Sequence, residues 1–167
     1  MIIRGRVWKY GDNINTDIIY PGKYTYMRYS PEEMARHSLE MLDPDFSREV
    51  QKGDVIVAGK NFGCGSSREQ AVQCLKYAGV GAIIGKSFAR IFFRNAINNG
   101  LLVIESQEAS ENLLNGEMIT IDTEKGEIRT NKQIFKFAPL PEFFTEIINC
   151  GGIIPYTQKR LRIRRRL

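Results

Sequence analysis

Residues 54–70 read DVIVAGKNFGCGSSREQ, in which a short apolar run passes into a glycine-rich loop and then into helix-compatible residues. The β-branched run at 54–58 is typical of a buried strand. Two similar apolar runs follow at 82–85 and 101–104, and helix-compatible segments at 67–78 and 88–98 separate them. This alternation at short intervals predicts right-handed crossovers and a parallel sheet.

The flanking sequence extends this pattern on the N-terminal side. A strand is predicted at 3–8, and a loop at 11–17 because Asx and Gly residues favour turns. Ser30 followed by Pro31 is typical of a helix N-terminus. This part of the chain therefore predicts a strand, a loop and a helix ahead of residue 54.

The C-terminal side has a different pattern. Short strand candidates separated by polar turns at 117–137 predict an antiparallel part, and 141–150 predicts a helix closed by Gly151-Gly152. With 167 residues and no visible linker, we predict a single domain over residues 1–167, with 159–167 as a basic C-terminal tail.

Composition indicates a soluble protein, since 43% of the residues are hydrophobic and 26% charged. No apolar run is long enough to cross a bilayer, and residues 1–8 lack the apolar stretch of a secretory signal. The three cysteines, Cys64, Cys74 and Cys150, are widely spaced and suit reduced thiols. We therefore predict a cytoplasmic protein.

The same cysteines argue against a metal site in this chain. Only one histidine, His37, is available to complete a ligand set for zinc or an iron-sulfur cluster. We expect no metal bound by this chain, and any metal to belong to a partner. His37 itself is expected to be structural or solvated.

Positive charge is concentrated at the C-terminus. The net charge is +5, but without six of the last nine residues the chain holds 18 Lys and Arg against 19 Asp and Glu, a net −1. Those six are Lys159, Arg160, Arg162, Arg164, Arg165 and Arg166. Nucleic-acid binding would therefore depend on the tail alone, and a solvated tail or a partner contact is the preferred interpretation.

The glycine-rich loop at 61–69 is the strongest candidate for a site. Its glycines let the backbone approach an anion, helix N–H groups can donate to it, and Arg68 can hold a carboxylate through two parallel hydrogen bonds. The spacing fits neither a phosphate-cradling nor a dinucleotide loop. The residues leave two interpretations: a loop that stabilises negative charge on oxygen, or an ordinary turn whose serines cap the helix.

Residues 63–71 closely resemble the Gly-x-Gly-Ser-Ser-Arg-Glu signature of the swivelling domain of aconitases and of isopropylmalate isomerase small subunits. Residues 11–19 and 87–101 are similar to further blocks of that family, in the same order. The resemblance implies an α/β fold, a swivelling β/β/α three-layer domain with a central parallel sheet, a smaller antiparallel sheet and a helical layer. It also implies a large partner subunit that carries a 4Fe-4S cluster.

The resemblance assigns roles within the loop. Ser66 matches the serine that takes the carbon-bound proton, while Ser67 and Arg68 match residues that hold substrate carboxylate and oxygen groups. The implied activity is that of a hydro-lyase that dehydrates and rehydrates a hydroxy-dicarboxylate and is active only with its large subunit. Because a serine hydroxyl is a poor base, this chemistry requires strong stabilisation of the alkoxide.

Substrate choice depends on the segment Tyr24, Thr25, Tyr26 and Met27, which corresponds to the specificity loop of the family. Homoaconitase relatives carry an arginine where this chain has Tyr26, so we expect apolar contact with an isopropyl group. The predicted reaction interconverts 2- and 3-isopropylmalate in leucine biosynthesis. A homoaconitase small subunit, with Arg28 supplying the cation, and an RNA-binding module are the alternatives.

Three further predictions concern side chains near the loop. Arg90 and Arg94 share a helix face and could bind carboxylates or pair with a partner. Cys64 is expected to be a small filler of the loop, and Cys74 and Cys150 to be core residues.

Overall fold

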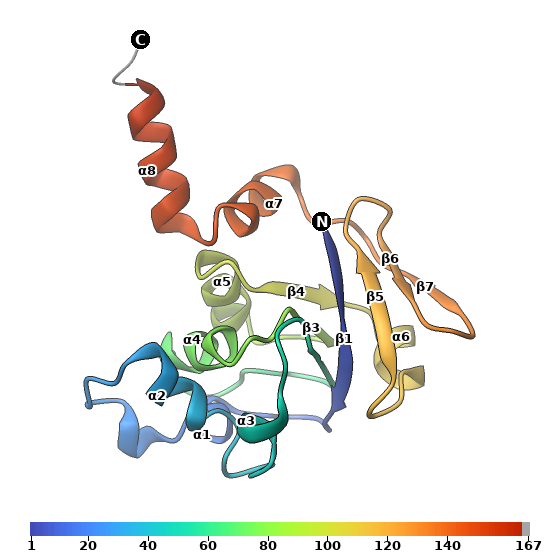
Figure 1. Ribbon diagram of the computed structural model, residues 1–167, viewed down its shortest axis with the longest axis horizontal. Coiled ribbons are helices and arrows are strands. Elements are labelled where there is room, and N and C mark those ends of the chain that lie inside the picture. The colour runs from blue at the N-terminus through green and yellow to red at the C-terminus, as the bar shows by residue number, and fades with distance from the viewer. Residues whose placement is uncertain (165–167) are drawn as a thin grey trace.

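The computed structural model describes residues 1–164, in which seven strands form a mixed sheet in the order β4-β3-β2-β1-β5-β6-β7 (Figure 1). The parallel strands are β1 (Ile2–Lys9), β2 (Val55–Ala58), β3 (Ala82–Gly85) and β4 (Leu102–Glu105). Antiparallel pairing then joins β1 to β5 (Met118–Asp122), β6 (Glu127–Arg129) and β7 (Ile134–Lys136). The predicted α/β class, with a parallel and an antiparallel part, is confirmed.

Strand β1 joins the two parts of the sheet. Residues 2–6 pair with β5, and residues 7–9 pair with β2. Where β1 passes the turn before β2, Gly5 is required, because a Cβ there would lie 2.1 Å from the carbonyl oxygen of Gly53. The antiparallel part is therefore continuous with the parallel part.

The helices in chain order are α1 (Thr16–Ile19), α2 (Pro31–Arg36), α3 (Phe46–Glu49), α4 (Gln70–Tyr77), α5 (Arg90–Asn98), α6 (Gln107–Asn112), α7 (Glu142–Asn149) and α8 (Ile153–Arg164), with a 3₁₀ turn at Gly22–Tyr24. The predicted start of α2 is confirmed by a capping box between Ser30 and Glu33. Helix α4 begins only at Gln70, so the serines and Arg68 stay in the loop. None of the helices within residues 1–164 combines the length and apolarity that crossing a bilayer requires.

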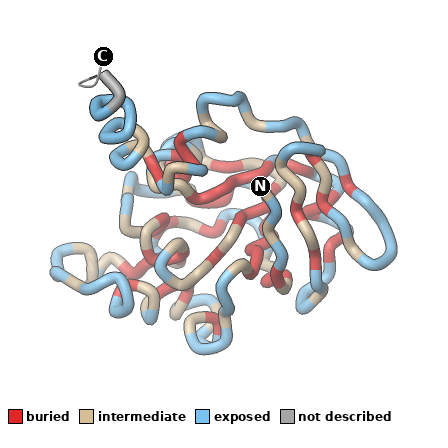
Figure 2. The backbone as a smooth tube through the Cα atoms, turned by 45° about the horizontal axis from the view of Figure 1, so that its top comes forward, coloured by how far each residue is buried: buried red, intermediate tan, exposed pale blue. Residues whose placement is uncertain are grey.

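Helices α1, α3, α6 and α8 lie where the sequence predicts no helix. Helix α1 falls at the end of the predicted loop, because Asn15, one of the residues that suggest a turn, caps a helical turn by accepting a hydrogen bond from the N–H of Ile18. Residues 159–164 of the predicted tail continue α8, which projects from the body of the protein (Figure 1) and is mostly exposed over its described residues (Figure 2). Residues 165–167 lie outside the described residues.

The core lies along the parallel strands. All four residues of β2 and all four of β3 are buried, as expected for parallel strands covered on both faces. Asp54, just before β2, is also buried, and its carboxylate accepts hydrogen bonds from Trp8 Nε1 at 2.9 Å and from the backbone N–H groups of Arg6 and Gln51. These bonds fix the start of β2 against β1.

Candidate functional site

Three segments far apart in the sequence meet beyond the carboxyl end of β2. The N–H of Gly63 donates to the carbonyl of Ile14 at 2.7 Å, and the N–H of Thr16 donates to the carbonyl of Cys64 at 2.8 Å. On the other side of the loop, the N–H of Ala89 donates to the carbonyl of Phe62 at 2.9 Å. The backbone of the glycine-rich loop is therefore held between α1 and the start of α5.

Gly63 sits at a point of close approach in this loop. Its φ is +76°, and a Cβ at this position would lie 2.1 Å from Cγ of Phe92. Phe92 is buried and packs edge-to-face on Phe62 with ring centroids 5.2 Å apart, so it has little room to move. The loop conformation therefore depends on glycine here.

Replacing Gly63 by alanine should lower the free energy of unfolding by roughly 3 kcal/mol, because the left-handed backbone and the clash with Phe92 both oppose a Cβ. Gly65 is the matched control: its φ is +92°, but a Cβ there would meet nothing closer than 3.4 Å. Gly65→Ala should cost about 1 kcal/mol from the backbone alone. Urea unfolding of both variants measures the difference, and equal losses would contradict the close packing described for Gly63.

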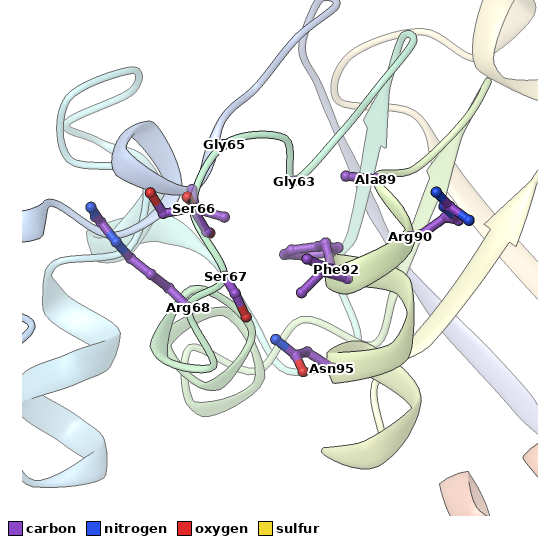
Figure 3. Close-up of a pocket in the computed structure, with 11 residues that line it drawn as sticks. Gly63, Gly65, Ser66, Ser67, Arg68, Ala89, Arg90, Phe92 and Asn95 are labelled. Atoms are coloured by element: carbon purple, nitrogen blue, oxygen red, sulfur yellow. Dashed lines mark hydrogen bonds between the residues drawn. The ribbon is translucent and has the colours of Figure 1, made fainter.

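Beside the loop lies an open pocket of about 220 Å³ (Figure 3). The loop forms one wall, and the first half of α5 forms the other. The lining residues are Thr16, Gly63, Gly65, Ser66, Ser67, Arg68, Ala89, Arg90, Ile91, Phe92 and Asn95.

Both serines of the loop are exposed at this pocket. The backbone carbonyl of Ser66 accepts a hydrogen bond from Thr16 Oγ1 at 3.0 Å, whereas within residues 1–164 neither serine hydroxyl has a hydrogen-bond partner. Helix α4 has Glu69 as its N-cap residue, without a side-chain cap. The serines therefore do not cap the helix, and the interpretation of the loop as an ordinary capped turn is wrong.

Arg68 lies on the side of the loop nearest α1. Its Nη1 is 2.5 Å from the carboxylate of Asp17, and a Cβ on Gly22 would be 3.2 Å from the same nitrogen. Figure 3 shows its side chain pointing away from Phe92. Asp17 engages only one end of the guanidinium, so other N–H donors remain for a ligand.

The segment Tyr24 to Met27 lies outside the pocket lining. The Tyr24 ring stacks on His37 with centroids 3.8 Å apart, and Thr25 Oγ1 is buried without a hydrogen-bond partner among the described residues. Tyr26 is 95% exposed and Met27 58% exposed. The structure thus gathers Ser66, Ser67 and Arg68 at one pocket and leaves residues 24–27 outside its lining.

The base of this segment is held by an ionic cluster. Nδ1 of His37 is 2.8 Å from Glu40, whose carboxylate is also 3.3 Å from Lys23 Nζ. Burial would raise the pKa of Glu40, but hydrogen bonds, first among them the one to His37, outweigh it and hold that pKa below its ordinary value. His37 therefore has a structural role, one of the two that the sequence suggests.

The cysteines occupy three different elements. Cys74 is fully buried in α4 as predicted, and burial raises the pKa of its thiol, which makes it unreactive. Cys64 is partly exposed in the site loop. The prediction of Cys150 as a core residue is wrong: it is partly exposed, because it follows the last turn of α7, where the chain turns at Gly151. Among residues 1–164, no group of three or more His, Cys, Asp and Glu side chains could hold a metal ion.

Most of the α5 residues that line the pocket are not identified from the sequence. Arg90 lines the pocket, although its side chain points away from the serines in Figure 3, and Arg94 is exposed and outside the lining. Ile91 and Asn95 also line it, and their spacing of four residues is the signal that could have found them. Thr16 joins from α1.

This topology, with a glycine-rich loop that presents two serines and an arginine at a pocket, is that of an aconitase-type domain. The chain belongs to the aconitase C-terminal domain family, whose family model matches residues 8–109. Crystallised aconitase X from Thermococcus kodakaraensis has the same fold at 16% identity, with a TM-score of 0.54 over 79% of this chain and 92% of that one.

Within this family, the chain groups with the small subunits of 3-isopropylmalate dehydratase. It is 53% identical to small subunit 1 of that enzyme from Thermotoga maritima, over 95% of this chain and 96% of the relative. It is 49% identical to the isopropylmalate/citramalate isomerase small subunit of Methanocaldococcus jannaschii, over 96% of each chain. The crystal structure of 3-isopropylmalate dehydratase from the same organism superposes with a TM-score of 0.94 at 45% identity, over 99% of both chains.

Proposed function

We propose that this chain is the small subunit of a 3-isopropylmalate dehydratase, a hydro-lyase that interconverts 2- and 3-isopropylmalate in leucine biosynthesis. The main support is the pocket lined by Ser66, Ser67 and Arg68, at which neither serine hydroxyl has a hydrogen-bond partner among the described residues. The similarity to dehydratase small subunits over nearly the full chain gives independent support. On this proposal, residues 1–167 form one swivelling domain and the enzyme is cytoplasmic.

Ser66 is the proposed base. Its Oγ, as the alkoxide, takes the proton from the carbon beside a substrate carboxylate, and the hydroxyl of the neighbouring carbon leaves as hydroxide, which a proton from solvent converts to water. Return of water with the opposite placement of hydrogen and hydroxyl gives the isomer. The positive charge of Arg68, which lines the same pocket, favours the alkoxide.

Ser67 and Arg68 are the proposed carboxylate ligands of the substrate. A serine hydroxyl donates one hydrogen bond, and a guanidinium offers several donors in a fixed plane. Because Asp17 orients the guanidinium from one end, Arg68 meets the substrate with little loss of side-chain freedom. The two residues would hold the substrate so that its carbon-bound proton faces Ser66.

A large subunit carrying a 4Fe-4S cluster completes the proposed enzyme. The described residues do not fit such a group, since their cysteines lie on separate elements and Cys74 is fully buried. The cluster would supply Lewis acidity from the partner side of the pocket. The pocket is open, which leaves its substrate accessible to a second protein surface.

Anaerobic co-expression with a large subunit of this enzyme class, followed by turnover assays, tests the proposal. The substrates are 2-isopropylmalate, citramalate and homoaconitate, because the Methanocaldococcus relative is named for the first two and the homocitrate pathway is the alternative. Turnover of isopropylmalate that neither subunit shows alone supports the proposal. A cluster-loaded complex that turns over only homoaconitate, or none of the three, contradicts it.

Tyr26→Arg tests the proposed role of residues 24–27 in substrate choice. The new guanidinium should favour a third carboxylate and disfavour an isopropyl group, so the ratio of isopropylmalate to homoaconitate turnover should fall by about tenfold. Met41→Arg, at a 68% exposed position outside this segment, adds the same charge as a control. If both variants keep the wild-type ratio, the assignment of this segment fails.

A further inference from the structure

We propose that Asn95 is a further substrate-binding residue, whose side-chain amide hydrogen-bonds to an oxygen of the hydroxy-dicarboxylate held against Ser67. The inference rests on the proposed function and adds the second wall of the pocket to it. The group that Asn95 would recognise is a carboxylate or hydroxyl oxygen of the substrate. The amide N–H can donate to either oxygen, and the amide oxygen can also accept from a hydroxyl.

The geometry of α5 places Asn95 opposite the glycine-rich loop. Ile91 and Asn95 lie one helical turn apart on the face that lines the pocket. Figure 3 shows the side chain of Asn95 directed toward Ser67 across the pocket. A ligand held by Ser67 therefore lies within the space that this amide faces.

The amide of Asn95 is also available. Asn95 is partly buried, and within residues 1–164 its side chain makes no hydrogen bond, although its backbone carbonyl accepts one from Asn99 Nδ2 at 2.9 Å. A partly buried amide without a partner is destabilising unless water or a ligand satisfies it.

Asn99, the C-cap residue four positions after Asn95, shows the contrast. Its Nδ2 also donates to the Glu69 carboxylate at 3.1 Å, and its Oδ1 accepts from Gln73 at 3.5 Å. These bonds connect the end of α5 to the start of α4, a structural role. Asn99, at the C-cap of α5, is therefore engaged by the protein, whereas Asn95, within the helix, is open to the pocket.

A substitution of nearly equal size that adds a negative charge tests the proposed contact of Asn95 with the substrate. Asn95→Asp keeps the shape but replaces a donor by a negative charge, which would oppose a substrate dianion. Asn98 lies three residues along α5, is exposed and is outside the pocket lining. Asn98→Asp therefore adds the same charge to the same helix without facing the substrate.

The experiment measures KM and kcat for 2-isopropylmalate with co-expressed complexes carrying Asn95→Asp, Asn95→Ser or Asn98→Asp. Asn95→Asp should raise KM at least tenfold, by loss of a hydrogen bond and gain of like-charge repulsion. Asn95→Ser, which adds no charge, should raise KM by about five- to tenfold. Asn98→Asp should stay within twofold of wild type.

Each other outcome is decisive. Wild-type KM in both Asn95 variants, with an active wild-type complex, overturns the inference and leaves the proposed function standing. A fall in kcat at unchanged KM overturns it too, because that result indicates positioning rather than substrate binding. If the wild-type complex turns over no isopropylmalate, the proposed function fails and the inference falls with it. If Asn95→Asp does not associate with the large subunit, the KM of Asn95→Ser decides.

Discussion

Replacing Ser66 by alanine is expected to lower kcat for 2-isopropylmalate by about 10³-fold or more, because the variant lacks the oxygen that takes the substrate proton. The hydroxyl of Ser66 is exposed and makes no hydrogen bond among the described residues, so its removal leaves the packing intact. The free energy of unfolding should therefore change by less than about 0.5 kcal/mol. Steady-state kinetics of the complex, with urea unfolding of the isolated chain, measures both effects.

Ser67→Ala is the matched control for Ser66→Ala. It removes a hydroxyl of the same size from the adjacent position of the same pocket. Because Ser67 is proposed to bind the substrate rather than to move a proton, its loss should act mainly on KM. Near-normal kcat in the Ser66 variant, or equal kcat losses in both variants, would contradict the assignment of Ser66 as the base.

Replacing Arg68 by lysine is expected to raise KM for 2-isopropylmalate by about a hundredfold. Lysine keeps the positive charge but lacks the planar fork that can contact Asp17 and a substrate carboxylate together. Loss of a charge-assisted hydrogen bond of roughly 2–3 kcal/mol corresponds to this change. KM is measured with the co-expressed complex.

Arg94→Lys provides the control for Arg68→Lys. Arg94 is exposed on α5 and does not line the pocket, so its KM should stay near that of the wild type. An unchanged KM in Arg68→Lys would show that the charge alone, and not the guanidinium geometry, serves the substrate. That outcome would contradict the proposal that Arg68 binds a substrate carboxylate through two parallel hydrogen bonds.

The sequence predicts the backbone organisation because local patterns determine most of it. Buried β-branched runs predict β2, β3 and β4, and the Ser30-Pro31 pair predicts the start of α2. The gathering of Ser66, Ser67 and Arg68 follows from their adjacency in one loop. These predictions need only strand and helix periodicity, turn chemistry and a family motif.

The other wall of the pocket depends on tertiary contacts that periodicity does not encode. Asn95 lies in a helix already predicted, but whether it faces solvent, core or the serine loop is determined by how α5 packs beside β4. Tyr24 is a similar case, because its stacking on His37 depends on α2 returning over the segment. Cysteine is usually buried, so the sequence predicts Cys150 to be a core residue, yet its position at the end of α7 leaves it partly exposed.

We propose that this chain contributes the base to a pocket that a partner subunit completes. The most direct measurement adds the purified chain, wild type or Ser66→Ala, to a cluster-loaded large subunit under anaerobic conditions and follows 2-isopropylmalate. The wild-type chain should produce turnover, and the Ser66→Ala chain should not, while competing with the wild type and reducing its turnover. Full turnover with Ser66→Ala, or with the large subunit alone, would contradict the account.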